Sequence, residues 1–124
     1  MKDGHTPLVL VVDDDPDILE ALAEILEVEG FESRRARNGK EALEKLGPRT
    51  PDLILLDLMM PVMDGWEFAQ KLQAIPDFSP PPIIVLSADR NVAAKAKELG
   101  AVAHLSKPFE LEELLQQVRQ TLGR

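Results

Sequence analysis

The alternation of strands and helices along this sequence predicts an α/β protein with a doubly wound parallel sheet. Three uninterrupted apolar runs, Leu8–Val12, Leu53–Leu56 and Ile83–Leu86, are bounded by turn residues, which is typical of strands buried on both faces. Between them lie segments whose apolar residues recur at helical spacing. Such strands are expected to be parallel, to carry helices on both faces of the sheet and to be joined by right-handed crossovers.

The first strand and the first helix are predicted between residues 8 and 30. Leu8–Val12 is apolar and rich in β-branched side chains, and Asp13-Asp14-Asp15-Pro16 ends it with an N-cap and a proline suited to a first helical turn. Gly30 is expected to end the helix. The buried face of this helix is predicted to consist of Ile18, Leu19, Leu22, Ile25 and Leu26.

The next residues predict an edge strand and a short helix. Phe31–Ala36 is more polar than the other strands, as is common at the edge of a sheet. Asn38-Gly39 is expected to cap a short helix, and Gly47-Pro48 to end it. The apolar residues of this helix are Ala42, Leu43 and Leu46.

The stretch from Leu53 to Gly65 organises the rest of the sequence. Leu53–Leu56 runs directly into a carboxylate, Asp57, and the chain then turns at Pro61 and Asp64-Gly65. A charge on a buried strand is costly unless it lies at the strand end, within reach of water, a metal ion or a partner. Asp57 is therefore predicted to be the chemical centre of the protein.

The second half of the chain predicts three helices and two strands. The apolar stripe of the third helix consists of Phe68, Leu72 and Ile75. A proline-rich connection leads to the strand Ile83–Leu86, and a helix over Asn91–Leu99 precedes a strand over Val102–Ser106. The last helix is expected to begin at Glu110. Its apolar stripe consists of Leu111, Leu114, Leu115, Val118 and Leu122.

Composition limits the class of protein. With 124 residues the chain is expected to form one domain over residues 1–124, and the absence of cysteine excludes disulfides and thiolate chemistry. No apolar run approaches the roughly 20 residues of a membrane span, and the N-terminal apolar stretch is too short for a signal peptide. A cytoplasmic location without membrane contact is expected. The net charge of −8 argues against direct nucleic-acid binding, which needs a basic patch.

Polar side chains follow four of the predicted strands, and they are Asp13, Asp14, Asp57, Ser87 and Lys107. Parallel strands end at the same edge of a sheet, with neighbours about 4.8 Å apart, so these groups are expected to converge. Clustered carboxylates repel one another unless a cation lies between them, and Mg²⁺ prefers such oxygen ligands. Lys107 and Ser87 suit the oxygens of a phosphoryl group. The set predicts metal-assisted phosphoryl transfer, with Asp57 as nucleophile.

Each of these residues also has an ordinary structural explanation when it is taken alone. The acidic run that follows the first strand can serve as a helix cap, and Asp57 can simply start a turn. Ser87 and Lys107 carry little information by themselves. The chemical interpretation therefore rests on their common position at one edge of the sheet.

Four segments together resemble the signature of response-regulator receiver domains from two-component signalling, in particular the single-domain regulators of the chemotaxis type. They are Val11-Val12-Asp13-Asp14, Leu56-Asp57-Leu58-Met59-Met60-Pro61-Val62-Met63-Asp64-Gly65, Leu86-Ser87-Ala88 and Lys107-Pro108-Phe109. The resemblance extends from about residue 8 to residue 122. It implies a flavodoxin-like (βα)5 sandwich of three layers, with a five-stranded sheet in the order 2-1-3-4-5.

The resemblance also implies a phosphoacceptor and a metal site. Asp57 would be the phosphoacceptor, and the phosphodonor would be a sensor histidine kinase or a histidine phosphotransfer protein. Asp13 and Asp14 would bind Mg²⁺, or alternatively Mn²⁺, together with Asp57 and the backbone carbonyl of Met59. The chain would be a signalling phosphoprotein that catalyses only its own phosphorylation and dephosphorylation.

Further roles follow from the same resemblance. Ser87 would hydrogen-bond the phosphoryl group and Lys107 would pair with it, with a cis bond between Lys107 and Pro108. Ser87 and His104 would act as switch residues, and the surface formed by Asn91–Leu99, the fifth strand and the last helix would change on activation. That surface would control a downstream effector protein.

Two features depart from the commonest pattern of the family. His104 occupies a position that usually holds an aromatic switch residue, and a partly exposed histidine without such a role is the alternative interpretation. Met59 and Asp89 lie where the family controls the loss of phosphate. Because Met59 has no polar side-chain group to orient a water molecule, slow autodephosphorylation is expected.

Three other functions compete with this interpretation. A phosphohydrolase that forms an aspartyl phosphate commonly has a second aspartate two residues after the nucleophile, where this chain has Met59. A flavin or nucleotide binder would need a glycine- or hydroxyl-rich loop after the first strand, where Asp13-Asp14-Asp15 would repel a phosphate. A receiver used only as a docking surface would not need the complete set of site residues.

Overall fold

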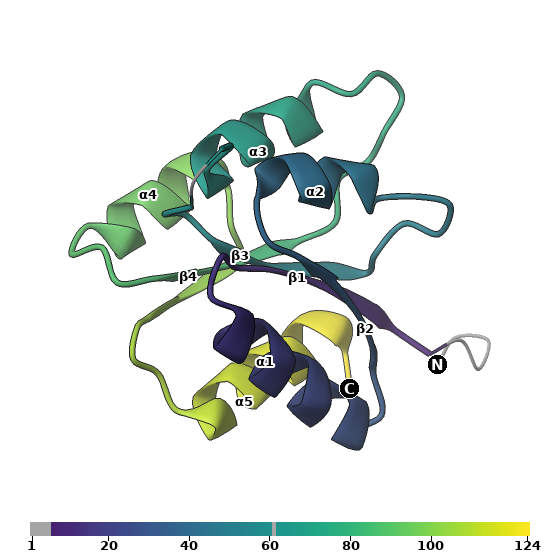
Figure 1. Ribbon diagram of the computed structural model, residues 1–124, viewed down its shortest axis with the longest axis vertical. Helices are drawn as coiled ribbons and strands as arrows, with labels where there is room; N and C mark the ends of the chain where they lie inside the picture. The colour runs from purple at the N-terminus through teal and green to yellow at the C-terminus, as the bar shows by residue number, and fades with distance from the viewer. Residues whose placement is uncertain (1–5, 61) are drawn as a thin grey trace.

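A five-stranded parallel sheet is the centre of the computed structural model, which describes residues 6–60 and 62–124 (Figure 1). The strands run in the order β2-β1-β3-β4-β5, and every neighbouring pair is parallel. This confirms the predicted fold class and strand order. The strands are β1 (Leu8–Val12), β2 (Glu32–Ala36), β3 (Leu53–Asp57), β4 (Ile83–Ser87) and β5 (Ala103–Ser106).

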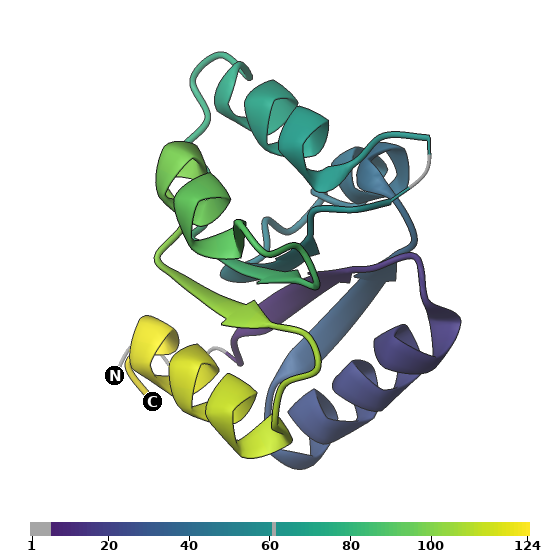
Figure 2. The ribbon, with the colours of Figure 1, turned by 90° about the vertical axis from the view of Figure 1, so that its left-hand side faces the viewer.

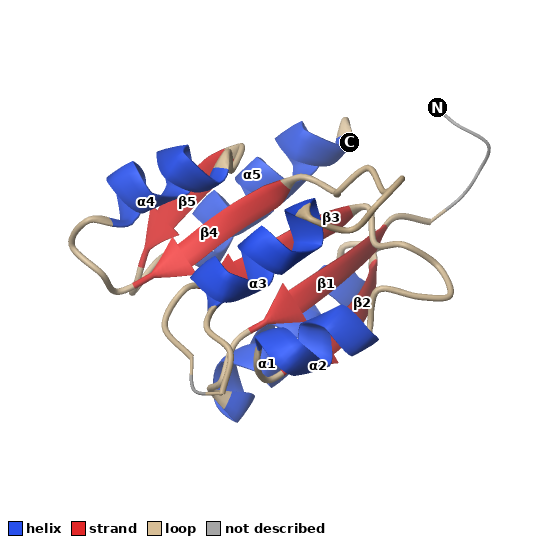
Figure 3. Cartoon of the chain, turned by 90° about the horizontal axis from the view of Figure 1, so that it is seen from above, coloured by secondary structure: helices blue, strands red, loops and turns tan. Residues whose placement is uncertain are grey.

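Helices cover both faces of the sheet and complete a three-layer sandwich. The helices are α1 (Pro16–Val28), α2 (Gly39–Glu44), α3 (Gly65–Gln73), α4 (Val92–Leu99) and α5 (Leu111–Leu122). Figures 1 and 2 show α1 and α5 on one face and α2, α3 and α4 on the other. Seen from above, the strand arrows all point toward the same edge (Figure 3). None of the described helices is both long and apolar enough to cross a membrane.

The central strands are buried because each contributes side chains to two hydrophobic clusters. Side chains alternate across a strand, so Leu10 and Val12 of β1 pack in the cluster beneath α2, α3 and α4, where Phe68 is fully buried. Val9 and Val11 belong to the cluster beneath α1 and α5. These two clusters hold the ends of β1 and β3 at a constant separation.

Hydrogen bonds to capping side chains set where α1, α2 and α3 begin. The Asp15 side chain accepts a hydrogen bond from the N–H of Asp17 at 2.9 Å, and Asn38 and Asp64 cap α2 and α3 in the same manner. Gly30 follows α1 with a φ of 93°, a conformation that glycine adopts without strain. The predicted turn at Pro61 lies outside the described residues.

Several predicted boundaries were wrong by one or two residues. Leu46 and Ile75 were assigned to the second and third helices, but the caps of those helices are Lys45 and Ala74. The apolar periodicity continues past the helix because both residues still pack against the core. Their N–H groups donate to the carbonyl three residues back, at 3.5 and 3.4 Å. The last strand starts at Ala103, one residue later than expected.

The start of α3 presses against the end of β3. The N–H of Gly65 donates to the carbonyl of Leu58 at 3.1 Å. A Cβ atom at position 65 would lie 2.4 Å from the carbonyl oxygen of Asp57 and 2.9 Å from the Cα of Leu58. Because both neighbours are backbone atoms, no side chain fits there, and this contact fixes the backbone that carries Asp57.

Replacing Gly65 by Ala is therefore expected to destabilise the protein by about 2 kcal/mol, the usual cost of forcing extra atoms into a packed region. Urea unfolding followed by circular dichroism measures this change. Gly47→Ala is the matched control, because a Cβ atom there would meet no heavy atom within 4 Å. Equal unfolding midpoints for the two variants would contradict the close approach at Gly65.

Candidate functional site

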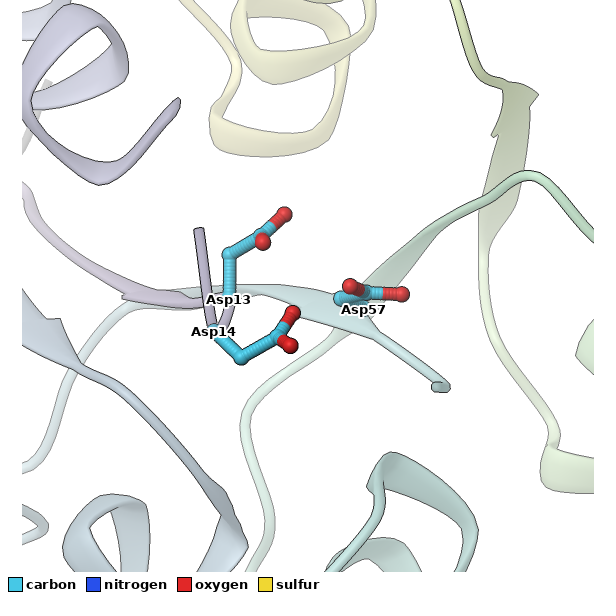
Figure 4. Close-up of side chains that lie close together, drawn as sticks. All are labelled: Asp13, Asp14 and Asp57. Carbon is cyan, nitrogen blue, oxygen red and sulfur yellow. The ribbon is translucent and has the colours of Figure 1, made fainter. Parts of the chain in front are cut away.

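Three carboxylates from two adjacent strands meet at the carboxyl edge of the sheet (Figure 4). Asp13 and Asp14 directly follow β1, and Asp57 is the last residue of β3. One oxygen atom from each of the three lies within 4.8 Å of the others. Asp13 and Asp57 are buried, with 1% and 4% of their surface exposed, whereas Asp14 is exposed. The convergence expected from the sequence is present for all three residues.

Lys107 reaches this cluster from the end of β5. Its Nζ atom lies 2.6 Å from Oδ2 of Asp13 and 3.2 Å from Oδ2 of Asp57. Burial by itself lowers the pKa of Lys107, but the contacts with these two carboxylates outweigh burial, and the pKa is raised above 10.5. The Lys107-Pro108 peptide bond is cis, as the family resemblance implied. Lys107 therefore offers a fixed positive charge between the two buried acids.

The surroundings of Asp57 disfavour its charged form. Burial raises the pKa of Asp57 above its ordinary value of 3.8, and the nearby charge of Asp13 acts in the same direction. The N–H of Met59, 3.1 Å from Oδ1, and the ammonium group of Lys107 oppose these effects without cancelling them. A cation beside Asp57, or a group bound covalently to its carboxylate, would offset the free-energy cost of the charged form.

Ser87 connects the site to α4. It is fully buried at the end of β4, and its Oγ accepts a hydrogen bond from the N–H of Asp89 at 3.1 Å. The carboxylate of Asp89 in turn lies 2.6 Å from Nζ of Lys95 and accepts from the N–H of Asn91 at 2.7 Å. The Lys95 contact holds the pKa of Asp89 below its usual value. The ion pair between Asp89 and Lys95 was not expected from the sequence, since its partners are six residues apart across a loop and a helix start.

Two other expected site residues lie at the edge of the cluster or away from it. Met59 contributes its backbone N–H to Asp57, while its side chain is 59% exposed. His104 is exposed on the edge strand β5, in register with Val85 of β4. The switch role of His104 stays a prediction.

The donor set fits a hard divalent cation. All three converging side chains offer carboxylate oxygens, the ligands that Mg²⁺ prefers. Their mutual repulsion and the raised pKa of Asp57 would both be offset by two positive charges. The arrangement can therefore hold a metal ion beside a carboxylate that could act as a nucleophile, and Lys107 contacts that same carboxylate.

Replacing Asp57 by Asn is expected to stabilise the metal-free protein at neutral pH. A raised pKa means that the folded protein binds this proton more tightly than the unfolded chain does, so the ionised carboxylate costs stability above both pKa values. The advantage of Asn should shrink as the pH falls through the raised folded pKa, and it should vanish below 3.8. Melting temperatures of both proteins, measured across this pH range in the presence of a chelator, test the sign of this stability difference. A variant that melts below the wild type at neutral pH would contradict it.

Comparisons with known proteins agree with this geometry. A family model described as the response regulator receiver domain matches residues 9–119. The response regulator MprA of Mycolicibacterium vanbaalenii is 41% identical over 118 residues, which are 94% of this chain and 50% of that protein. The chain thus spans about half the length of the curated relatives it matches.

Solved structures give the same result. A putative response regulator from Chloroflexus aurantiacus is 34% identical with a TM-score of 0.86, over 97% of this chain and 100% of that one. The response regulator TrrA from Thermotoga maritima, solved in complex with Mg²⁺-BeF, is 34% identical with a TM-score of 0.81, over 94% and 99% of the two chains. This chain belongs to the family of response regulator receiver domains of two-component systems.

Proposed function

We propose that this chain accepts a phosphoryl group on Asp57 and transmits the event through a change of its surface. The observation that carries the proposal is the meeting of three carboxylates and one ammonium group at a single edge of the sheet. A cluster of this kind, with Asp13 and Asp57 buried, is costly as a purely structural device, because the carboxylates repel one another. Such a cost is expected where the carboxylates take part in a reaction.

Asp13, Asp14 and Asp57 would hold Mg²⁺, with the backbone carbonyl of Met59 as a further ligand and Mn²⁺ as an alternative ion. The support comes from the all-oxygen donor set within 4.8 Å and from the related structure of TrrA with Mg²⁺-BeF. When bound, the ion would offset charge on the oxygens of the transferred group. The attack on phosphorus and the other contacts with the transferred group would come from side chains of the protein.

The reaction would be a direct transfer from a phosphohistidine. A carboxylate oxygen of Asp57 attacks phosphorus and forms a P–O bond, giving an acyl phosphate. The P–N bond to the histidine breaks, its electron pair returns to the imidazole nitrogen, and that ring is released after taking up a proton. Lys107, already in contact with Oδ2 of Asp57, would pair with an oxygen of the transferred group. The hydroxyl of Ser87 would donate to another oxygen.

The signal would leave the site through the end of β4. Ser87 accepts from the N–H of Asp89, and Asp89 holds Lys95 of α4. A displacement of the Ser87 hydroxyl toward the phosphoryl group would alter these contacts and shift the first turn of α4. We infer that Ser87 and His104 act together as the switch, and that the surface formed by α4, β5 and α5 changes as a result.

The partners would be proteins. The phosphodonor would be a sensor histidine kinase or a histidine phosphotransfer protein in the cytoplasm, and the output would be a downstream effector protein. The net charge of −8 favours protein contacts over direct binding to nucleic acid. The chain would act as a phosphoacceptor for signalling, and its own phosphorylation and dephosphorylation would be the only reactions that it catalyses.

Incubation with acetyl phosphate and Mg²⁺ is expected to add one phosphoryl group, detected by intact-protein mass spectrometry. Asp57→Asn and a chelator should each abolish the addition, because the first removes the nucleophile and the second removes the cation. Asp77→Asn is the matched control, since Asp77 is an exposed aspartate in the loop between α3 and β4. Persistent labelling of Asp57→Asn would refute the assignment of the phosphoacceptor.

The phosphorylated protein is expected to decay over minutes or longer at neutral pH. Met59 presents an apolar side chain next to the site, and the carboxylate of Asp89 is already engaged by Lys95 and the N–H of Asn91. Neither residue then has a free polar group to orient an attacking water molecule. Decay after removal of the phosphodonor, followed by mass spectrometry, gives the half-life. A half-life of seconds would contradict this expectation.

A further inference from the structure

A groove of about 780 Å³ lies beside the carboxylate cluster, between the loop that follows β3 and helix α4. One wall is formed by Leu58, Met59 and Trp66, and the charged residues Asp64, Lys95 and Glu98 border it. Asp57 is not part of its lining, whereas Asp14 lies at the end closest to the metal ligands. The groove therefore adjoins the phosphoacceptor site and shares Asp14 and Met59 with it.

The apolar wall of the groove remains open to solvent. Trp66 packs against the hydrophobic cluster beneath α2, α3 and α4, but it is only partly buried. Met59 has 59% of its surface exposed. An indole ring and a thioether that line the same groove offer an apolar surface on which the hydrocarbon stem of a long side chain can lie. The indole ring also attracts cations that lie over its face.

The charges around this wall are strongly unequal. Four carboxylates, from Asp14, Asp64, Asp89 and Glu98, face one ammonium group, that of Lys95. Lys95 is paired with Asp89 at 2.6 Å. Within the described part of the chain, Asp14 and Glu98 form no ion pair. Once Asp14 contributes to the metal site, Glu98 and Asp64, whose Oδ1 accepts from the N–H of Glu67, still line the groove.

We propose that this groove binds an arginine or lysine side chain from a basic segment of a partner protein. The stem would lie on Met59 and Trp66, and the cationic head would interact with the indole face and with Glu98 and Asp64. The contact of Lys95 with Asp89 shows that a carboxylate of this groove accepts an ammonium group at hydrogen-bond distance. The net charge of −8 would steer such a segment toward the protein.

The charge excess argues against other occupants. An apolar segment would remove water from several carboxylates without replacing their hydrogen bonds, which is costly. An anionic ligand would be repelled. The proposal does not require phosphorylation of Asp57, so its failure and the failure of the proposed function can be told apart.

The probe is a short capped peptide that contains two arginines separated by glycines, compared with the same peptide containing citrulline, a neutral analogue of arginine. Emission of Trp66 reports binding without interference, since the chain has one Trp and no Tyr. Saturating Mg²⁺ keeps the metal site filled, so that a change in Trp66 emission reports on binding in the groove. The arginine peptide is expected to shift the emission saturably, and the citrulline peptide to bind at least about fivefold more weakly.

Two substitutions in the groove should change the affinity for the arginine peptide in opposite directions. Glu98→Gln removes an attractive charge and should weaken binding about threefold, whereas Lys95→Gln removes a competing cation and should strengthen it about threefold. A gain of affinity cannot result from misfolding. Glu24→Gln, an exposed change on α1 at the opposite face of the sheet, should leave binding unchanged, and Glu98→Gln and Glu24→Gln should still accept phosphate from acetyl phosphate.

Three results would overturn the proposal. Equal affinity for the arginine and citrulline peptides would show that charge is not recognised. Equal affinity of Glu98→Gln and Glu24→Gln would show that the peptide binds elsewhere. Emission of Trp66 that depends on protein concentration without any peptide would identify a second copy of the chain as the occupant.

Discussion

The electrostatic repulsion at the carboxyl edge of the sheet is the constraint around which this structure is arranged. Asp13 and Asp57 are buried with Asp14 beside them, and burial together with the neighbouring charge raises the pKa of Asp57. The strands cannot separate to relieve this repulsion, because the residues before each carboxylate are buried in clusters on both faces of the sheet. Lys107 supplies one compensating charge, and a divalent cation would supply the rest.

The turn after β3 depends on the same constraint. Asp57 can keep its position only if the backbone behind it is fixed, and Gly65 fixes it by lying against the carbonyl of Asp57. Asp64 then caps α3 through the N–H of Glu67, so the helix begins at once. One short segment thus carries the proposed nucleophile Asp57, the glycine that supports it and one wall of the neighbouring groove. This explains why Asp57, Asp64 and Gly65, each with a structural or chemical role, lie so close together in the sequence.

Much of the fold and the main cluster could be predicted from the sequence. Uninterrupted apolar runs identify buried strands, and parallel strands bring the residues that follow them to one edge, so the meeting of Asp13, Asp57 and Lys107 follows from simple geometry. Contacts made after the chain has turned could not be predicted in this way. The ion pair of Lys95 with Asp89 and the close approach of Gly65 depend on loop conformation, which periodicity does not report. Helix ends were misplaced at Leu46 and Ile75, because apolar residues continue to pack after the helix has ended.

The proposed function requires that Asp57 itself forms the acyl phosphate. Treatment of the phosphorylated protein with borohydride converts an aspartyl phosphate into homoserine, which peptide mass spectrometry locates at a single position. The structure predicts homoserine at position 57 and unmodified aspartate at positions 13 and 14. Homoserine at either of those positions, or phosphate retained on Ser87 after the reduction, would contradict the assignment of Asp57 as the phosphoacceptor.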